Sequence, residues 1–136
     1  MPFHLDIVTP ERKVFSEQVD EVVLPGAEGE LGLRPGHAAL VTAMVAGELT
    51  YRKSGSSVSI AVGHGFAEVT EEKVVVLTDV AFEEDAIDEE AVAEAIERAE
   101  KELAEVDPED AEERAAMQRA IAASMAQLAL KKKRRG

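Results

Sequence analysis

The spacing of apolar residues changes once along this chain of 136 residues, close to residue 86. Up to that point apolar residues alternate with polar ones or come in short bursts, as in Phe3, Leu5 and Ile7. Beyond it they recur at steps of three and four residues. Alternation is typical of β-strands, and the longer step is typical of amphipathic helices. The sequence therefore predicts a mostly β plus α chain, with a β domain over residues 1–84 and a helical region over residues 85–136.

The first region is expected to fold as an antiparallel β-sandwich or barrel. Its apolar bursts are short and rich in β-branched residues, and clusters of turn-forming residues separate them. The expected turns are Pro25-Gly26, Pro35-Gly36, residues 54–57 and residues 63–65. Short strands at regular spacing favour a sandwich or barrel, and their alternation with polar residues favours antiparallel pairing with one solvated face.

The second region is expected to form an antiparallel two-helix hairpin. Asp88 is the expected N-cap of the first helix, because its carboxylate can accept a hydrogen bond from a free backbone N–H. Asp107 and Pro108 are expected to end that helix and begin the second, with the aspartate as cap and the proline at the first helical position. The apolar stripes are Ile87, Ala91, Val92, Ala95, Ile96, Ala99, Leu103 and Val106, then Ala111, Ala115, Ala120, Ile121, Met125, Leu128 and Leu130. Alanine buries the area of only about one or two methylenes, so two helices that touch through alanine stripes should hold together weakly. We expect them to separate, swing or extend more easily than the sandwich unfolds.

Charge is distributed unevenly along the chain. The formal net charge is −13 at pH 7, which argues against general nucleic-acid binding because phosphates would be repelled. Residues 1–82 carry a net −6, residues 83–113 a net −14, and residues 114–136 a net +7 with no acidic residue. The basic end therefore suits an acidic surface, and the acidic segment before it offers one within the chain.

Several classes of function are disfavoured by what the sequence lacks. It has no cysteine, which excludes disulfides and thiolate metal sites and fits a reducing compartment. No nucleophile motif, phosphate-binding loop or dinucleotide fingerprint is present, and His4, His37 and His64 are not spaced as a helical metal pair. No secretory signal and no membrane-spanning apolar run are visible. We therefore expect a non-catalytic binding and regulatory protein without a metal or cofactor, with a metal-dependent hydrolase as a further alternative.

Residues 28–40 combine turn-forming and apolar residues in one segment. Gly29, Gly32, Pro35 and Gly36 would each interrupt a regular element, whereas the leucines of the segment need burial. A loop of this kind is typical of a surface shaped for a partner. The alternative is a β-bulge or a corner inside the sandwich.

The same segment carries a family resemblance. Glu30-Leu31-Gly32, followed by residues 35–38, resembles the signature loop of the epsilon subunit of F-type ATP synthases, which is called delta in mitochondria. Further pieces resemble the first strands, the last strands and the start of the helical tail of that family, in the same order: residues 3–10 with 14–16, residues 63–69 with 74–79, and Ile87-Asp88. Together these pieces extend over most of the chain.

The resemblance implies a subunit of the central stalk of a rotor, peripheral to the membrane and on the cytoplasmic face of the cell membrane. It implies that the β domain binds the gamma subunit and rests on the c-ring, so that proton-driven rotation is coupled to ATP synthesis. By the same resemblance Glu30, Leu31, Gly32 and His37 are the candidate rotor contacts. The alternative for the leucines, and above all for Leu33, is that they fill the core of the sandwich itself.

The resemblance also implies a switch. In bacterial members the hairpin is permissive when folded against the β domain, and it restrains ATP hydrolysis when extended along gamma into the catalytic head of alpha and beta subunits. The candidate inhibitory residues are Arg114, Arg119, Lys131, Lys132 and Lys133. An acidic segment of a beta subunit would compete for these bases with the acidic segment of this chain, which would make the hairpin bistable. Two alternatives remain for the basic tail, residues 131–136: solvation alone, or binding to anionic lipid.

One departure from the family concerns regulatory ATP. Many bacterial members bind ATP through an Ile/Leu-Asp-x-x-Arg-Ala motif at the start of the first tail helix. Ile87 and Asp88 match its first two positions, but Ala91 replaces the arginine, and Glu89 and Glu90 lie between. Because a triphosphate would meet net negative charge there, we expect ATP binding by the isolated subunit to be weak or absent.

The sequence leaves one alternative function from a different class. A non-enzymatic β-sandwich adaptor, whose helical hairpin docks on another protein partner, would have the same composition and periodicities. Co-purification with a gamma-like coiled coil and a c-ring would separate the two hypotheses.

Overall fold

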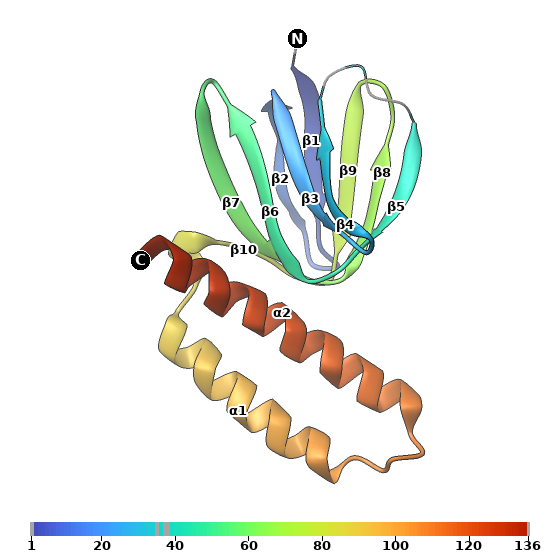
Figure 1. Ribbon diagram of the computed structural model, residues 1–136, viewed down its shortest axis with the longest axis vertical. Coiled ribbons are helices and arrows are strands. Elements are labelled where there is room, and N and C mark those ends of the chain that lie inside the picture. The colour runs from blue at the N-terminus through green and yellow to red at the C-terminus, as the bar shows by residue number, and fades with distance from the viewer. Residues whose placement is uncertain (1, 35, 37–38, 136) are drawn as a thin grey trace.

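A computed structural model describes residues 2–34, 36 and 39–135 of the chain. It contains a β body with a pair of long helices attached at one end (Figure 1). The strands are β1 (Phe3–Val8), β2 (Lys13–Val19), β3 (Glu21–Gly26), β4 (Gly29–Leu33), β5 (Leu40–Met44), β6 (Gly47–Lys53), β7 (Ser56–Val62), β8 (Gly65–Val69), β9 (Lys73–Thr78) and β10 (Ala81–Glu83). A short 3-10 turn, η1 (Glu84–Ala86), leads into the helices α1 (Glu89–Glu105) and α2 (Ala111–Arg135).

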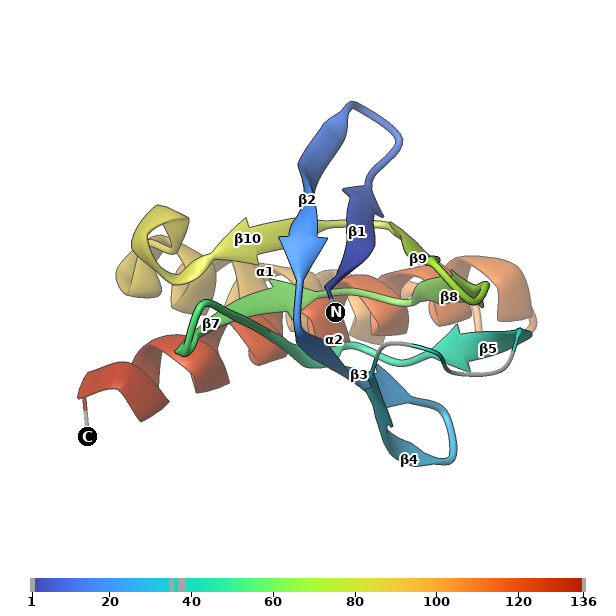
Figure 2. The ribbon, with the colours of Figure 1, turned by 90° about the horizontal axis from the view of Figure 1, so that it is seen from above.

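The strands form one curled sheet in the order β10-β7-β6-β3-β5-β8-β9-β1-β2, with β4 paired to β3 outside this path. The curl produces a near-closed sandwich, from which the β1–β2 and β3–β4 hairpins project on opposite sides (Figure 2). The expected β-sandwich or barrel is thus confirmed. Its pairs are antiparallel except one, because β1 lies parallel to β9 with His4 opposite Lys73. Such a pair joins strands distant in sequence, so no hairpin turn restricts its direction.

The core of the body comes from the inward side of alternating strands. In β9, Val74, Val76 and Thr78 are buried, whereas Leu77 faces outward. The core consists of Phe3, Leu5, Ile7, Phe15, Val19, Val22, Leu24, Leu33, Met44, Leu49, Tyr51, Ile60, Val62, Ala67, Val69, Val74 and Val76. One continuous apolar cluster of this size is the main source of stability for a domain of this length.

Pro25 and Gly26 lie inside a strand, so the turn expected there is wrong. They form the end of β3, where the strand changes partners: Val23 is opposite Thr50 of β6, and Gly26 is opposite Met44 of β5. Proline is tolerated where the regular ladder is interrupted in this way. The Pro25 carbonyl still accepts a hydrogen bond from the Val45 backbone N–H at 2.9 Å.

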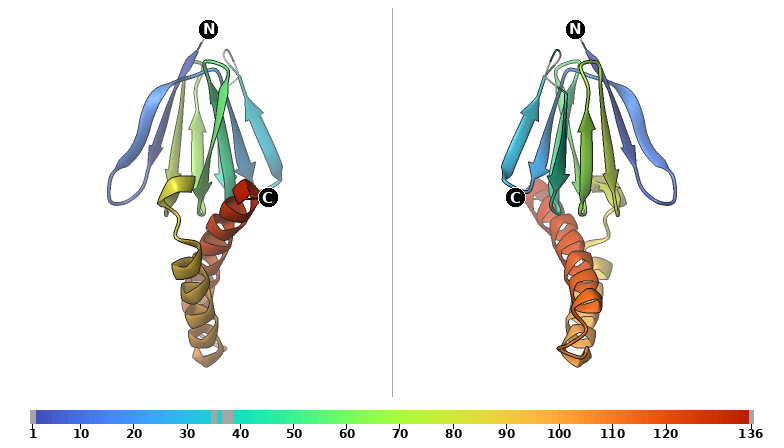
Figure 3. Two further views of the ribbon diagram at one scale, coloured as in Figure 1. Left: turned by 90° about the vertical axis from the view of Figure 1, so that its left-hand side faces the viewer. Right: turned by 90° about the vertical axis from the view of Figure 1, so that its right-hand side faces the viewer.

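The two helices form the expected antiparallel hairpin (Figures 1 and 3). The N-cap role of Asp88 is confirmed, because its side chain accepts a hydrogen bond from the backbone N–H of Ala91 at 3.1 Å. The start expected for the second helix is wrong. Asp107 accepts from the Glu109 N–H at 2.9 Å within the connecting loop, and Asp110 instead accepts from the Glu113 N–H at 3.1 Å at the start of α2. Both aspartates can bind backbone N–H groups, and the one next to the first helical turn acts as the cap.

The buried face of α2 also differs from the expected stripe. Ile121 and Leu130 are buried as expected, but Met125 is 48% exposed. Over residues 111–133 of the helix, the other buried positions are Ala123 and Gln127. Because α2 packs on α1 along one side and on the ends of β6 and β7 along another, a single apolar stripe does not describe its contacts.

The hairpin touches the body through few side chains. Ala61, Ile87 and Leu130 form a small apolar cluster separate from the main core, with Phe82 and Val92 packed against it. A second contact joins Ala123 of α2 to Gly63, where a Cβ added to the glycine would lie 3.4 Å from that of Ala123. Both contacts involve α2 or the start of α1, and most of α1 lies away from the sheet (Figure 1).

Candidate functional site

The segment expected to form a partner-binding loop is partly a strand. Residues 29–33 are β4, which pairs with β3 from Gly26 opposite Gly29 to Val22 opposite Leu33. Gly29 has a φ of 121° and Gly36 a φ of 82°, which other residues rarely adopt. The glycines therefore begin β4 and shape the loop after it.

The candidate contact residues of this segment differ in exposure. Glu30 and Gly32 are exposed, and Leu31 is half-buried against the edge of the core. Leu33 is 3% exposed and belongs to the core, as the alternative interpretation of the leucines expected. Arg34 follows and forms an ion pair with Glu21 at 2.8 Å, while His37 lies outside the described residues. The contacts that these residues make with another subunit stay a prediction.

A second candidate surface, absent from the sequence-based predictions, covers the outer face of β5, β8 and β9. Val41 is 68%, Phe66 58% and Leu77 45% exposed. The register places Phe66 of β8 directly opposite Leu77 of β9. Glu68 lies opposite Val41 on this face, so its apolar part is centred on the pair of Phe66 and Leu77. An exposed apolar pair of this kind is typical of a protein interface. The sequence carries one signal for this surface, the run Val74-Val75-Val76-Leu77. A strand with one buried face needs apolar residues only at alternate positions, so this run predicts an apolar outer face as well.

A shallow depression adjoins this apolar face. It is lined by Val8, Thr9, Pro10, His64, Gly65, Phe66, Leu77, Thr78 and Asp79. The Nδ1 atom of His64 is buried and has no hydrogen-bond partner among the described residues. Because this nitrogen is buried, a molecule lying against the depression would meet its apolar lining and not the imidazole nitrogen. The depression and the exposed Phe66 and Leu77 together make an apolar surface.

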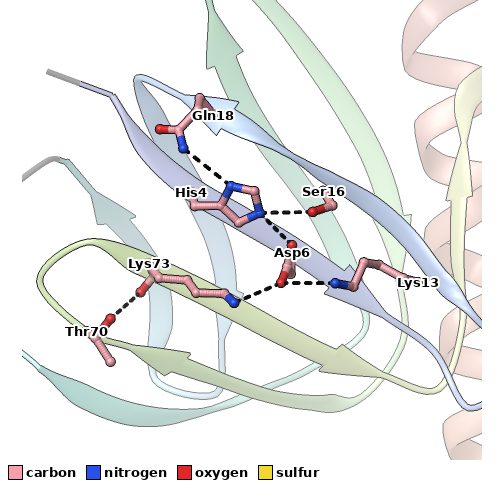
Figure 4. A network of polar contacts seen from close by, with 7 residues as sticks. All are labelled: His4, Asp6, Lys13, Ser16, Gln18, Thr70 and Lys73. Carbon is pink, nitrogen blue, oxygen red and sulfur yellow. Dashed lines mark hydrogen bonds and ion pairs between the residues drawn. The ribbon is translucent and has the colours of Figure 1, made fainter.

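The most connected polar cluster of the body surrounds a buried carboxylate (Figure 4). Asp6 is 3% exposed, and its Oδ1 lies 2.8 Å from Nε2 of His4. Its Oδ2 lies 3.2 Å from the Lys73 ammonium and 3.6 Å from that of Lys13. The hydroxyl of Ser16 holds the pKa of the Asp6 carboxyl well below its usual range, with smaller lowering by Lys73, His4 and Lys13 against the effect of burial. The cluster therefore stabilises a charged group that links β1, β2 and β9.

The cluster contains serine, histidine and aspartate but lacks the geometry of a catalytic triad. A triad needs the carboxylate on one imidazole nitrogen and the serine on the other. Here the same Nε2 of His4 faces Asp6 at 2.8 Å and Ser16 at 2.9 Å, while Nδ1 faces the Gln18 amide nitrogen at 3.4 Å. Such a histidine cannot take a proton from the serine and be oriented by the aspartate, so the role of the cluster is structural.

The candidate inhibitory bases of α2 fall into two groups. Arg114 and Arg119 are in the first half of the helix and have no ion pair with another described residue. Lys131 and Lys133 at its end are paired with the acids of η1 and β6 at 3.4 and 3.0 Å. Lys132, between them, is exposed. Lys131 and Lys133 thus form ion pairs with the start of the acidic segment and with the β body, and not with helix α1.

The residues that match part of an ATP-binding motif have structural roles. Ile87 is 4% exposed in the small cluster with Ala61 and Leu130. Asp88 caps α1, and Ala91, at the arginine position of the motif, is exposed. Among the described residues, Asp88 forms no ion pair with a basic side chain. Weak or absent ATP binding stays a prediction.

Two further properties bear on the kind of site. Among the described residues, no three His, Asp or Glu side chains gather in a way that could hold a metal ion. Within the same residues, neither helix combines the length and the apolarity that a bilayer span requires. The candidate contact surfaces among the described residues are an apolar sheet face, a strand with the segment that follows it, and a basic helix end.

Comparison with known proteins gives consistent matches. Residues 2–84 match the family model of the ATP synthase delta/epsilon chain, β-sandwich domain. The ATP synthase epsilon chain of Geobacter sulfurreducens is 45% identical over 120 residues, which cover 86% of this chain and 87% of that one. The epsilon chain of Desulforamulus reducens is 52% identical over 99 residues, or 73% and 75% of the two chains.

Among solved structures, the chain resembles a chain in the Euglena gracilis mitochondrial ATP synthase, a structure that contains OSCP, F1 and the c-ring. The TM-score is 0.74 at 23% sequence identity, over 95% of this chain and 81% of that chain. A chain in the central stalk and c-ring structure of the Tetrahymena thermophila mitochondrial ATP synthase matches 62% of this chain with a TM-score of 0.54. At these identities the similarity supports the fold, including the helices beyond the domain that the family model covers.

Proposed function

This chain belongs to the delta/epsilon family of ATP synthase subunits, and from that membership we propose that it is a rotor subunit of the central stalk that couples gamma to the c-ring. The observation that carries the proposal is the match of the whole β body, residues 2–84, to the β-sandwich domain of that family. Members of the family are non-catalytic subunits, so the chain is not an enzyme in its own right. We place it on the cytoplasmic face of the cell membrane, peripheral to the bilayer.

The apolar face of β5, β8 and β9 is the surface that we assign to gamma. Phe66 and Leu77 supply aromatic and aliphatic area at its centre, and aromatic residues in such positions often dominate binding energy. The depression beside them, lined in part by Val8, Pro10 and Gly65, extends this apolar surface. A coiled coil of gamma, which presents apolar side chains on one face, suits such a surface.

The end of the body away from the helices is the surface that we assign to the c-ring. Figure 1 places the end of β4 and the start of β5 at that end, and α2 at the opposite one. Glu30, Leu31, Gly32 and His37 remain the candidate rotor contacts, although Glu30, opposite Pro25 at the start of β4, lies nearer the helix-proximal end of the body. Opposite ends of one rigid body can thus serve the ring and the hairpin without overlap.

The hairpin is the element that we assign to the restraint of ATP hydrolysis. Few side chains hold it to the body, and the basic side chains of its second helix suit an acidic surface of a catalytic beta subunit. Arg114 and Arg119, without ion pairs among the described residues, are available for such a surface. Extension of the hairpin would then block rotation in the hydrolysis direction.

Truncation tests the restraint. ATP hydrolysis by the assembled complex is measured with the full chain and with a chain that ends at Ala86. A several-fold rise in hydrolysis on truncation is the expected result, because the body stays bound and the hairpin is lost. An unchanged rate would remove the restraint and leave the coupling role. That role is lost if the chain fails to co-purify with gamma and the c-ring.

Substitution tests the gamma surface. Phe66→Ser removes an exposed aromatic side chain and should weaken binding to gamma by about 1–2 kcal/mol. Val45→Ser is the matched control, because Val45 is an exposed apolar residue of the body that follows β5 and does not belong to the hairpin. Both variants should melt like the wild type, and titration of purified gamma would measure the difference. Equal affinities for the two variants would place the gamma surface elsewhere.

A further inference from the structure

The C-terminal end of α2 meets the β body through one apolar and two basic side chains. Leu130 is 2% exposed and packs with Ala61 of β7 and Ile87. Two nearby basic residues, Lys131 and Lys133, extend to two different parts of the body. Figure 3 shows this end of α2 rising beside the strands while the rest of the hairpin descends from them.

The two lysines bind different elements of the body. The Lys131 ammonium lies 3.4 Å from the Glu84 carboxylate and 3.3 Å from the backbone carbonyl of the same residue, in η1. The Lys133 ammonium lies 3.0 and 3.2 Å from the two carboxylate oxygens of Glu48 in β6. The Lys131 and Glu84 side chains are only 25% and 26% exposed, so this pair is partly shielded from water and salt.

We propose that Glu48 and Glu84 form an acidic cradle on the β body that latches the hairpin by its basic end, with residues 130–133 of this chain as its occupant. Leu130 supplies the apolar contact, and the two ion pairs fix which end of the helix docks. Lysines near a helix C-terminus also complement the partial negative charge of that end. An acidic surface elsewhere in an assembly would compete for the same two lysines. The latch takes its regulatory meaning from the proposed function, but it exists in the isolated chain.

The expected strength of the latch makes it reversible. Partly exposed ion pairs each shift an equilibrium by up to about fivefold, and salt weakens them. A latch of two such pairs holds the hairpin without fixing it permanently. Lys132, which is exposed between the two paired lysines, carries the same charge and makes no ion pair with another described residue. It is therefore an internal control for charge alone.

Thiol labelling of the isolated full chain measures undocking directly. The chain has no cysteine, so Ala123→Cys introduces a single thiol at a position that is 7% exposed and faces Gly63. Its labelling rate reports the fraction of time that α2 is away from the body. In this background Lys133→Glu should raise the rate about three- to tenfold at low salt. Lys132→Glu should leave it within about twofold, and 0.5 M NaCl should shrink the difference.

Charge exchange and a core thiol complete the test. Glu48→Lys combined with Lys133→Glu restores an ion pair of reversed sign and should return the rate to within about twofold of the parent. Ala67→Cys, at a fully buried position of the body, reports opening of the body and should label equally slowly in all variants. Equal rates for Lys132→Glu and Lys133→Glu, no rescue by the charge exchange, or a parallel rise at Ala67→Cys would each overturn the latch. None of these results depends on ATP hydrolysis, so they leave the proposed function to its own test.

Discussion

The β body and the helical hairpin of this chain are stabilised in different ways. The body encloses one continuous core of large side chains contributed by nearly all its strands. In the hairpin, Ile96 is the one buried residue of α1, and the buried positions of α2 include an alanine and a glutamine. Since stability follows the apolar area removed from water, the body can remain folded while the hairpin moves. Such a difference in stability suits a protein that stays bound to one partner through its body while its hairpin changes position.

The largest effect is expected from the core of the body. Leu49 in β6 is fully buried, so Leu49→Ala should lower the free energy of unfolding by about 2–5 kcal/mol. Urea denaturation followed by circular dichroism measures the change. Leu128→Ala, at a half-buried position of α2, is the comparison and should change the main transition much less. Similar shifts for both would mean that body and hairpin unfold as one unit.

The buried carboxylate of the body should give the next largest effect. Asp6→Asn should cost about 1–3 kcal/mol at neutral pH, because the charged hydrogen bonds and ion pairs of Asp6 are lost. The folded pKa of Asp6 is depressed, so this stabilisation is present above about pH 4, the usual pKa, and is lost as the pH falls below it.

The pH dependence separates this effect from a general one. The difference in stability between wild type and Asp6→Asn should be constant from pH 7 to 5 and shrink below about pH 4. Asp85→Asn, at an exposed position, should follow the wild type throughout. A constant difference down to pH 2 would show that the Asp6 charge contributes nothing.

Crowding the contact between hairpin and body should release the hairpin alone. Ala123 packs closely against Gly63, so Ala123→Leu should destabilise docking by about 1–3 kcal/mol. Small-angle scattering should show a larger radius of gyration, while the midpoint of the main unfolding transition stays unchanged. Ala129→Leu, at an exposed position of the same helix, should behave as the wild type. A lower midpoint for Ala123→Leu would contradict independence of the two regions.

A smaller effect is expected at the start of α1. Asp88→Ala removes the hydrogen bond to the Ala91 N–H and should weaken the hairpin helix by about 1 kcal/mol. Helical circular dichroism near its first thermal transition measures this loss. Asp88→Asn keeps an acceptor oxygen and should cost less. Equal losses for the two variants would show that the charge of Asp88, and not its hydrogen bond, supports the helix.

The smallest effect concerns ATP. Ala91 replaces the motif arginine and Glu89 and Glu90 precede it, so calorimetry on the isolated chain should detect no micromolar ATP binding. ATP should likewise leave labelling of Ala123→Cys unchanged. Micromolar affinity would mean that bases from elsewhere in the hairpin replace the arginine.

Local sequence patterns predict which helices and strands form better than they predict where each one begins and ends. The alternation of Phe3, Leu5 and Ile7 identified β1, and Asp88 identified the start of α1. Asp107 was the wrong cap, because two aspartates three residues apart can both bind backbone N–H groups and only the geometry of the loop selects one. Pro25-Gly26 predicts a turn but ends β3, because a strand that changes partners has no local sequence signature.

By itself, the sequence determined that a β domain is followed by a helical hairpin, because periodicity is a local property of the chain. It also determined the separation of acidic and basic segments. Only the tertiary structure decided that Phe66 and Leu77 face outward together, and that Lys131 and Lys133 meet Glu84 and Glu48. Those outcomes depend on strand register and on contacts between residues distant in sequence, and both are set by how the whole chain packs.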